Sequence, residues 1–274
     1  MQRVEVTYEK TPTSIGIPVS KLRKQLHGSV ICYPGNDLSS FPARIKQLRE
    51  IGTSEIIFEG SSKIGNLGVI GKGCVSIVLK ARLKGSDDIV ALKCRRVDAN
   101  RESMKRDFEL QKLANSFGVG PKAIIASKDF FAMEFVDGIK VGKWLQRLKT
   151  RSSKKFLRRL IRDSLTQCFL LDQHRLDHGE LSNPTKHILI RMDESGNLVP
   201  KIVVIDYESA GTKRKVSNLT SVAQFFFLGG WQSRKIRKIL GLADEKVKLL
   251  PLLKDYKLKN SLENFDKIMK YIQC

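Results

Sequence analysis

The sequence DHGELSNPTKHILIRMDESGNLVPKIVVIDYESA, residues 177–210, decides how the rest of the chain is interpreted. It places Glu180 after a His-Gly pair, followed by an apolar run at 188–190, a turn, and a second apolar run at 202–205 that ends in Asp206. Two short strands joined by a turn bring both carboxylates to one edge of a small sheet. Two neighbouring carboxylates supply a base or orienting group and a metal ligand, which is what phosphoryl transfer requires.

The length and composition are those of an ordinary globular protein. With 274 residues, the chain is long enough for one large or two small domains, and 41% of its residues are hydrophobic. No apolar run approaches the roughly 18 residues of a membrane span, and the N-terminus MQRVEVTYEKT lacks the apolar core of a signal peptide. We therefore expect a soluble, cytoplasmic protein without a membrane partner.

Five cysteines are present, at positions 32, 74, 94, 168 and 274, and none pairs with another at C-x-x-C spacing. An odd number of cysteines without a secretory signal favours reduced thiols over disulfides or a zinc site. Cys74 falls inside a glycine-rich turn, but no neighbouring residue marks it as reactive, so we expect it to be inert.

The net charge of +22 is the strongest compositional signal. It indicates either a phosphate-rich partner, such as RNA or a ribonucleoprotein, or a lysine-rich surface that only faces solvent. The basic residues gather in clusters at 151–162, 213–215 and 234–238. No aromatic-rich RNA-binding motif accompanies these clusters, so the composition leaves both interpretations open.

The hydrophobic pattern divides the chain into three segments. Residues 1–52 form an N-terminal extension with one amphipathic helix at 40–51. Residues 53–136 are rich in strands, since apolar residues alternate over 75–83 in the pattern of a half-buried strand. We expect the other elements of this segment to be a returning strand at 89–94, a helix at 101–117, and strands at 123–125 and 130–135.

Residues 137–274 are mainly helical after a linker at Asp137-Gly138. The helices are predicted at 141–150, 154–173, 219–228, 232–240, 245–254 and 260–272, with the strand pair of the opening stretch among them. The sequence therefore predicts an α+β protein in which a β-rich segment precedes a short, mainly helical one.

A glycine-rich turn, Gly71-Lys72-Gly73-Cys74-Val75-Ser76-Ile77-Val78, opens the first predicted strand pair. A dinucleotide-binding turn requires a helix after its glycines, whereas these glycines precede a strand. A Walker A loop requires Gly-Lys-Ser/Thr, whereas Lys72 precedes Gly73. The remaining alternative is a hairpin, whose glycines either let backbone N–H groups approach phosphate oxygens or serve the turn alone.

Lys93 lies in the returning strand, in the motif Val90-Ala91-Leu92-Lys93. The period of a strand places Ala91 and Lys93 on one face, and Ala91 is small enough to lie against a flat base. A lysine in an otherwise apolar strand needs a counter-charge or a phosphate. Asp107 lies on the apolar stripe of the following helix and is the favoured counter-charge, with the longer Glu109 as the alternative.

These motifs resemble the protein kinase superfamily and occur in the same order as in that superfamily. The order here is the Gly loop, VALK, the helix acid, the hinge MEFVDG, HGEL and IDYE. More closely, the whole chain resembles the archaeal predicted serine/threonine protein kinases, a group beside the RIO and Bud32 atypical kinases. That resemblance rests on GKGCVSIV, RRVDANRESM, LANSFGVGPK, DHGELS, KHILI, IDYESA and SNLTSVAQFFF. It implies a bilobal protein-kinase-like fold with a β-rich N-lobe and a short, mainly helical C-lobe.

The resemblance also implies ATP and Mg²⁺ or Mn²⁺ as cofactors. Lys93, with Asp107 or Glu109, and Glu180, at the position of the catalytic-loop Asp, would be the catalytic residues. Asp206 would be the metal-binding Asp, and His187 would stand where the second metal-binding Asn is found. The nucleotide would contact Ile70, Gly71, Lys72, Gly73, Val78, Ala91, Lys93, Glu134 and Phe135.

The sequence departs from the kinase pattern at two of these positions. Glu180 is one methylene longer than Asp, and a displacement of about 1 Å in a catalytic group can cost on the order of a hundredfold in rate. His187 suits Mn²⁺ better than Mg²⁺ and also fits a structural, hydrogen-bonded role. The resemblance implies transfer of the ATP γ-phosphate to a protein Ser or Thr, the chain itself included. The alternatives are a RIO-like ATPase switch on a ribonucleoprotein and a nucleotide-binding pseudokinase.

Overall fold

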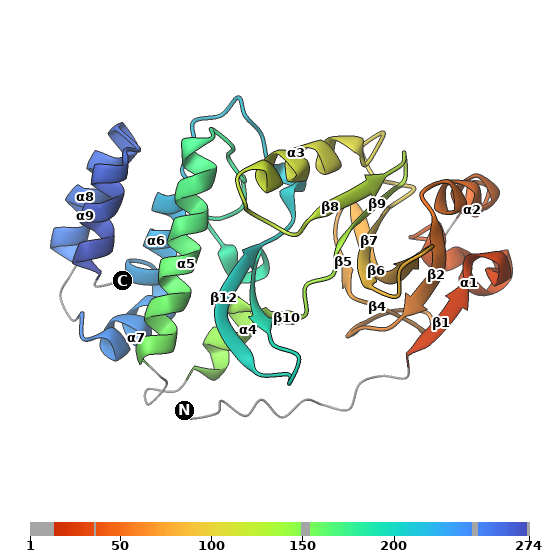
Figure 1. Cartoon of the computed structure of the whole chain (residues 1–274), viewed down its shortest axis with the longest axis horizontal. Coiled ribbons are helices and arrows are strands. Elements are labelled where there is room, and N and C mark those ends of the chain that lie inside the picture. Colours follow the sequence, from red (N-terminus) through yellow and green to blue (C-terminus); the bar gives the residue numbers. More distant parts are fainter. Residues whose placement is uncertain (1–13, 36, 149–153, 243–245, 273–274) are drawn as a thin grey trace. The chain divides into compact units, whose positions relative to one another are not determined.

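The computed structural model describes residues 14–35, 37–148, 154–242 and 246–272. The chain divides into two compact units. Of the described residues, the N-terminal unit contains those up to Lys112 and Pro121–Phe135, and the C-terminal unit contains Leu113–Gly120 and those from Val136 onward. The first unit is rich in strands and the second is mainly helical (Figure 1), which confirms the predicted α+β class.

An antiparallel sheet forms the centre of the N-terminal unit. Within the described residues its strand order is β1-β2-β6-β7-β9-β8, and β5 pairs with β6 beside this path. A separate hairpin joins β3 (Ser62–Ile64) and β4 (Leu67–Val69). The strands of the sheet are β1 (Ile15–Pro18), β2 (Thr53–Phe58), β5 (Gly71–Lys72), β6 (Ser76–Leu83), β7 (Ile89–Arg95), β8 (Ala123–Ala126) and β9 (Phe130–Glu134).

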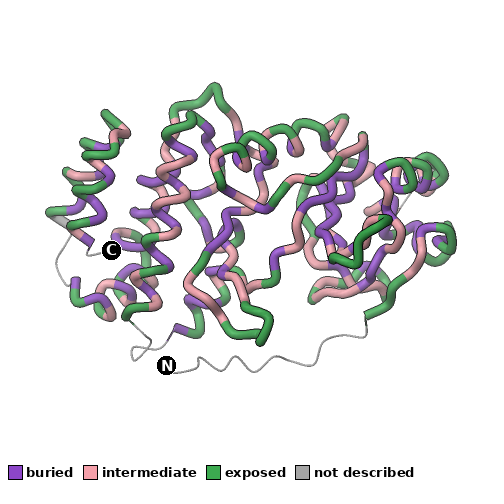
Figure 2. Tube along the Cα trace, viewed as in Figure 1, coloured by how far each residue is buried: buried purple, intermediate pink, exposed green. Residues whose placement is uncertain are grey.

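Helices cover both faces of this sheet, and its central strands are buried (Figures 1 and 2). α1 (Lys24–Ile31) and α2 (Phe41–Glu50) pack on the face that carries Val90, Leu92 and Cys94. α3 (Lys105–Ser116) covers the opposite face, where its preceding residue Met104 packs with Ala91, Phe131 and Met133. The two-residue period of the strand therefore assigned the two faces of β7 correctly.

α3 begins four residues later than the helix predicted at 101–117. The Met104 N–H donates to the Lys128 carbonyl (2.8 Å), and the Arg101 carbonyl accepts from the Arg95 guanidinium (3.1 Å). These contacts hold the chain against the sheet before the helix starts. The Lys105 N–H, the first of the helix, donates to the Ser103 hydroxyl (3.1 Å). A side-chain acceptor of this kind is typical of a capped helix start.

A small antiparallel sheet lies in the C-terminal unit, in the order β10-β11-β12. β11 (Ile188–Met192) and β12 (Leu198–Val204) are the two strands predicted from the opening stretch. The predicted linker at Asp137-Gly138 is wrong, because Gly138 begins a third strand, β10 (Gly138–Lys140). A Cβ on Gly138 would lie 2.4 Å from the Ile190 carbonyl oxygen, so the close pairing of β10 with β11 requires glycine there.

The predicted helices of the C-terminal unit are all present, although their ends differ by a few residues. Residues 149–150 of the first prediction, 245 of the fifth, and 151–153 of a basic cluster lie outside the described residues. No helix in the described part of the chain has the length and apolar character needed to cross a membrane. The helices are α4 (Val141–Arg147), α5 (Lys154–Gln173), α6 (Asn218–Phe227), α7 (Gly230–Leu240), α8 (Lys246–Leu258) and α9 (Leu262–Tyr271).

Asp172, near the end of α5, joins three helices of this unit. One oxygen of its carboxylate accepts from the Asn218 backbone N–H (3.0 Å) and side-chain amide (2.8 Å). The other accepts from the Leu219 N–H and the Tyr256 hydroxyl, both at 3.1 Å. Burial raises the pKa of Asp172 to about 6, and these donors oppose that shift.

Asp172→Asn should therefore destabilise the C-terminal unit by about 3 kcal/mol. An asparagine offers one acceptor oxygen and an NH₂ group, so two of the four donors at Asp172 would face another donor. Urea unfolding followed by circular dichroism measures the loss. Asp266→Asn, on an exposed part of α9, is the matched control and should change the free energy of unfolding little. Equal stability of both variants would contradict this role for Asp172.

The cysteines agree with the expected reduced state. Cys32, Cys74, Cys94 and Cys168 are free, and Cys274 lies outside the described residues. Burial raises the pKa of the Cys94 thiol to about 12 and that of Cys168 well above its usual value. Cys74 is exposed, unlike the other three.

Candidate active site

The glycine-rich turn is a hairpin, as the sequence predicts. Gly71 pairs with Val78, and the Ile70 N–H donates to the Val78 carbonyl (2.9 Å). At the tip, the Gly73 N–H donates to the Ser76 carbonyl (2.8 Å). A Cβ on Gly71 would meet no atom within 4 Å, so packing does not require glycine at this position. That free space is available to a ligand, as a phosphate-covering loop needs.

The Lys72 side chain forms a hydrogen bond with the backbone of β3. Its ammonium group donates to the Lys63 carbonyl (3.1 Å) in an exposed position. The Gly73 carbonyl accepts from the guanidinium of Arg96 (3.1 Å), the residue directly after β7, which fixes the turn against the end of that strand. Arg96 was not predicted as a site residue, because an arginine after a strand carries no motif.

Lys93 is buried, with 3% of its surface exposed, on the face of the sheet covered by α3. Its cross-strand neighbours are Val78 on β6 and Phe131 on β9. Ala91 lies two residues before Lys93 on the same face, with Met133 opposite it on β9. The structure thus brings Val78, Ala91 and Lys93 together on adjacent strands, as the nucleotide hypothesis requires.

Asp107 lies on the inner side of α3 and Glu109 on its exposed side. Asp107 is 1% exposed, and its carboxylate accepts a hydrogen bond from the Arg101 guanidinium. Phe108, the next residue, packs edge-on against Phe131, the strand partner of Lys93 (5.6 Å between ring centroids). This placement favours Asp107 over Glu109 as the acid that faces the lysine strand, and adds Arg101 as a partner that sequence spacing did not reveal.

Glu134 and Phe135 are the predicted hinge residues; Glu134 ends β9 and Phe135 follows it. The Glu134 N–H donates to the Lys122 carbonyl (2.8 Å), and its carboxylate accepts from the Lys122 N–H (3.1 Å). The Phe135 ring packs on the Ala91 cluster, and the Lys80 ammonium lies 4.8 Å from the centre of that ring. Lys80 in turn pairs with Glu59 (2.8 Å). A cation and an aromatic ring therefore border the face on which Ala91 lies.

In the C-terminal unit, Glu180 contacts two other polar side chains of the predicted site region. One oxygen of its carboxylate accepts from the Ser209 hydroxyl, and the other lies 2.9 Å from Nε2 of His187. The second contact places the imidazole proton on Nε2, because a carboxylate is an acceptor. Nδ1 of a neutral His187 then carries a free lone pair.

That lone pair makes His187 and Asp206 a fitting pair of metal donors. Nδ1 of His187 is buried, has no hydrogen-bond partner, and lies 3.9 Å from a carboxylate oxygen of Asp206. A ligating histidine usually donates its other ring N–H to a carboxylate, and Glu180 provides one. Within the described ranges, no group of three or more His, Cys, Asp and Glu side chains is arranged to hold a metal. A divalent ion here would take its remaining ligands from phosphates and water, as Mg²⁺ usually does.

The backbone at Asp206 is left-handed, with φ of 74°. Such a conformation costs free energy for a residue with a side chain, although Asp tolerates it better than most, and it is found mainly at functional sites. The Ile205 N–H donates to the His187 carbonyl (2.8 Å), which fixes the chain immediately before Asp206. The turn therefore holds Asp206 at the end of β12 next to His187.

His178 has a structural role. The ring is fully buried, and Nε2 lies 3.0 Å from the Ile205 carbonyl. Its backbone N–H donates to the Asn218 side chain (2.9 Å). Burial lowers the pKa of His178 to about 4, which keeps the ring neutral at physiological pH.

Lys140 lies close enough to Asp206 for their charges to interact. Loss of hydration lowers the pKa of Lys140, Asp206 opposes this by raising it, and Lys143 and Lys186 lower it further. Asp206, Lys143 and Lys186 are therefore all close enough to Lys140 to influence its charge. Such a cluster neutralises phosphate oxygens well. Lys140 ends β10, a strand that the sequence analysis did not predict, and so it was not named as a site residue.

Arg214 joins the two loops of the site. It pairs with Asp177 (2.9 Å) and donates to the Ser209 carbonyl (2.5 Å). Asp177 and Gly211 also exchange backbone hydrogen bonds of 2.9 and 2.8 Å. Gly179 has φ of +88°, and a Cβ there would lie 2.6 Å from the Ser209 carbonyl oxygen. The loop that carries Glu180 and the turn after Asp206 are therefore in direct contact.

Comparisons with known proteins find similarity among solved structures but not among family models or curated sequences. No family model and no curated protein match the sequence. A crystal structure described as the kinase domain of PF14_0431 is similar, with a TM-score of 0.43 and 17% identity. The likeness covers 54% of this chain and 51% of that chain, which is about half of each. The case for a function therefore rests on the residues of this chain.

Proposed function

We propose that the chain is an ATP-dependent phosphotransferase of the atypical serine/threonine kinase type. It transfers the γ-phosphate of ATP to a Ser or Thr hydroxyl of a protein, its own chain included. The proposal rests on the cluster of Glu180, His187 and Asp206. The Glu180 carboxylate accepts from a hydroxyl and orients the His187 ring. The free ring nitrogen of His187 then faces the Asp206 carboxylate. Phosphoryl transfer uses these groups to position an acceptor and to neutralise charge.

Each residue has a role in this proposal. Glu180 orients the acceptor hydroxyl and receives its proton. His187 and Asp206 would hold a divalent metal, Mg²⁺ or Mn²⁺, which when bound offsets the charge of the phosphates. Lys93 binds the α- and β-phosphates, with Asp107 as its orienting acid. The hairpin from Ile70 to Gly73 covers the phosphates, and Val78, Ala91, Glu134 and Phe135 bind the adenine.

A labelled-ATP assay tests the proposal. The purified chain is incubated with [γ-³²P]ATP, Mg²⁺ or Mn²⁺, and a general acceptor protein such as dephosphorylated casein. We expect label on protein, and we expect Lys93→Met to abolish it, because methionine keeps the apolar stem but cannot bind phosphates. Lys84→Met, at an exposed position beyond β6, is the matched control. ATP hydrolysis without protein labelling would favour an ATPase switch, and binding without either reaction would favour a pseudokinase.

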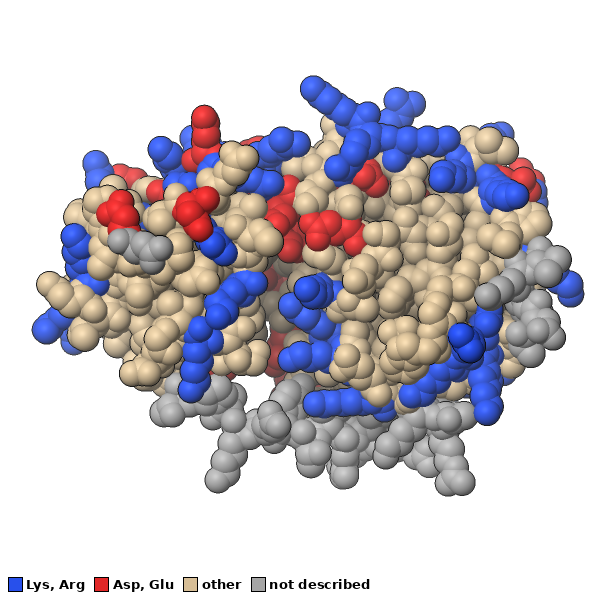
Figure 3. All heavy atoms as spheres, turned by 180° about the vertical axis from the view of Figure 1, so that it is seen from behind, with Lys and Arg blue, Asp and Glu red and all other residues tan. Residues whose placement is uncertain are grey.

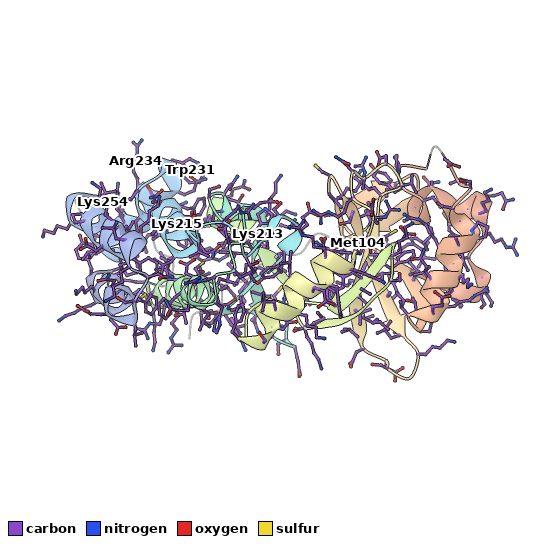
Figure 4. All side chains as sticks on the ribbon, turned by 90° about the horizontal axis from the view of Figure 1, so that it is seen from above. Met104, Lys213, Lys215, Trp231, Arg234 and Lys254 are labelled. Atoms are coloured by element: carbon purple, nitrogen blue, oxygen red, sulfur yellow. The ribbon has the colours of Figure 1, made fainter. Side chains whose placement is uncertain are left out.

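A second proposal, that the chain binds RNA, has support from one face of α7. This helix contains no acidic residue, and Trp231, Arg234 and Lys238 are exposed on it. The Trp231 ring is 51% exposed, with the Lys235 ammonium 5.7 Å from its centre. Figure 4 shows Trp231 and Arg234 standing out from the helix in the same direction, and Figure 3 shows many Lys and Arg side chains on this unit. An exposed ring among cations suits stacking with an unpaired base.

Single-stranded RNA should therefore quench the fluorescence of Trp231. The only other tryptophan, Trp144, is buried and should respond little, so Trp231→Phe should remove the signal. Arg234→Ala with Lys238→Ala should reduce the dependence of log Kd on log salt by about 2, or one unit for each lost phosphate contact. Lys24→Ala with Lys46→Ala, both exposed on the N-terminal unit, is the matched control. An unchanged salt dependence in the α7 variant would contradict this partner surface.

A further inference from the structure

The hydroxyl that contacts the candidate base belongs to the chain itself. Ser209 closes the short helix η3 (Tyr207–Ser209), three residues after Asp206. Its hydroxyl donates to one oxygen of Glu180, and the other oxygen of Glu180 faces His187. A general base must lie within hydrogen-bond reach of the proton it removes. The hydroxyl proton of Ser209 lies within hydrogen-bond reach of Glu180.

The backbone contacts around Ser209 hold it in this position. Its carbonyl accepts from the Arg214 guanidinium (2.5 Å) and packs so closely on Gly179 that a Cβ there would clash. Tyr207, at the start of the same turn, is buried, and its carbonyl accepts the Ala210 N–H (3.0 Å). Ser209 is half-buried, and the Glu180 side chain is 36% exposed, so the hydroxyl is held firmly and stays open to a reactant.

We propose that Ser209 is an intramolecular phosphate acceptor, an inference that rests on the phosphotransferase function proposed above. The Ser209 oxygen forms a new bond to the γ-phosphorus of ATP, and the bond from that phosphorus to the β–γ bridging oxygen breaks. ADP leaves with the electron pair of the broken bond. The hydroxyl proton passes to Glu180.

The charges near Ser209 fit both the reactant and the product. Lys140 interacts electrostatically with Asp206, three residues before Ser209, and its positive charge would attract a triphosphate. Arg214 already bonds the Ser209 carbonyl, so its guanidinium is close enough to pair with a phosphate on the same residue. A phosphoserine would also repel Glu180 and thereby release the carboxylate from its present hydroxyl partner. Modification of Ser209 would then free Glu180 for a hydroxyl from another protein.

Mass spectrometry of the full chain tests this proposal. The dephosphorylated protein is incubated with ATP and Mg²⁺ or Mn²⁺, and peptides are sequenced to locate phosphate. We expect phosphoserine at 209 and a rate per chain that does not change with protein concentration. We expect Ser209→Ala to lower incorporation into the chain at least tenfold, and Ser209→Thr to restore it as phosphothreonine. Thr212→Ala, an exposed hydroxyl three residues further on, is the matched control and should keep phosphate at Ser209.

Two further measurements distinguish failure of this inference from failure of the phosphotransferase proposal. A thermal shift with a non-hydrolysable ATP analogue shows that each variant is folded and binds nucleotide without turnover. An inactive Lys93→Met chain mixed with active protein should remain unlabelled at Ser209, because the transfer is intramolecular. Phosphate on casein or on other residues of the chain, with Ser209 unmodified, would overturn this inference alone. No transfer to any acceptor would overturn the phosphotransferase proposal, and this inference with it.

Discussion

Asp206→Asn should lower phosphate transfer by about a thousandfold while the chain stays folded. Asparagine tolerates the left-handed backbone at this position as well as aspartate does, so the substitution adds no strain at φ of 74°. It removes only the negative charge and one acceptor oxygen. Both are needed if the residue holds a divalent metal beside the free nitrogen of His187. Initial rates of labelling measure the effect.

Binding of Mn²⁺ provides a second measurement for Asp206 that does not require turnover. Titration followed by electron paramagnetic resonance, with the ATP analogue present, should show weaker Mn²⁺ binding in Asp206→Asn. The control is Asp266→Asn, which removes an exposed charge on α9. Full transfer activity in Asp206→Asn would show that this carboxylate is not a metal ligand.

Glu180→Gln is the second substitution with a large expected effect, a loss of about a hundredfold to ten-thousandfold in transfer. The amide cannot take up the acceptor proton. It also cannot accept from both Ser209 and His187 through separate oxygens, because one of its two ends is now an NH₂ donor. That NH₂ group would face the N–H of His187 and favour the other tautomer of the ring. The nitrogen that faces Asp206 would then carry a proton.

This tautomer shift predicts that Glu180→Gln also weakens Mn²⁺ binding, although Glu180 is not a metal ligand in our proposal. Glu180→Asp is the matched comparison, since it keeps two acceptor oxygens but withdraws them by one methylene. We expect Glu180→Asp to keep the imidazole tautomer and Mn²⁺ binding better than Glu180→Gln. Retention of full transfer by Glu180→Gln would show that the carboxylate is neither base nor orienting group. Nitrogen-15 spectra of the histidine rings report the tautomer directly.

Local periodicity predicted the elements well, because each side chain in a strand or helix faces its neighbours at a fixed spacing. The alternation in β6 and β7 placed Lys93 and Ala91 on the face that α3 covers. The same logic chose Asp107, which is buried, over Glu109, which is exposed. Periodicity did not predict the shortest elements: the three residues of β10 are too few to show a period, and its first residue, Gly138, was assigned to a linker.

Sequence patterns could not predict contacts between loops that are far apart in the sequence. The Ser209 hydroxyl reaches Glu180 only because Asp177 and Gly211 pair and Arg214 spans the two loops. No spacing rule relates these positions. The conformation of Asp206 was equally hidden, since a left-handed turn at a non-glycine residue depends on the surrounding hydrogen bonds. The sequence predicted the candidate side chains, and the fold determined which of them meet.

Because Cys74 is exposed, it can be labelled chemically to study the glycine hairpin. Among the described residues it is the one exposed cysteine, whereas Cys32, Cys94 and Cys168 are buried. With Cys274 replaced by serine, a maleimide reagent should therefore attach a dye or spin label at Cys74, beside the tip of the loop. The labelling rate reports the accessibility of the hairpin, and the attached label reports its motion. Nucleotide protection of this thiol would map the hairpin as a ligand contact without any measurement of catalysis.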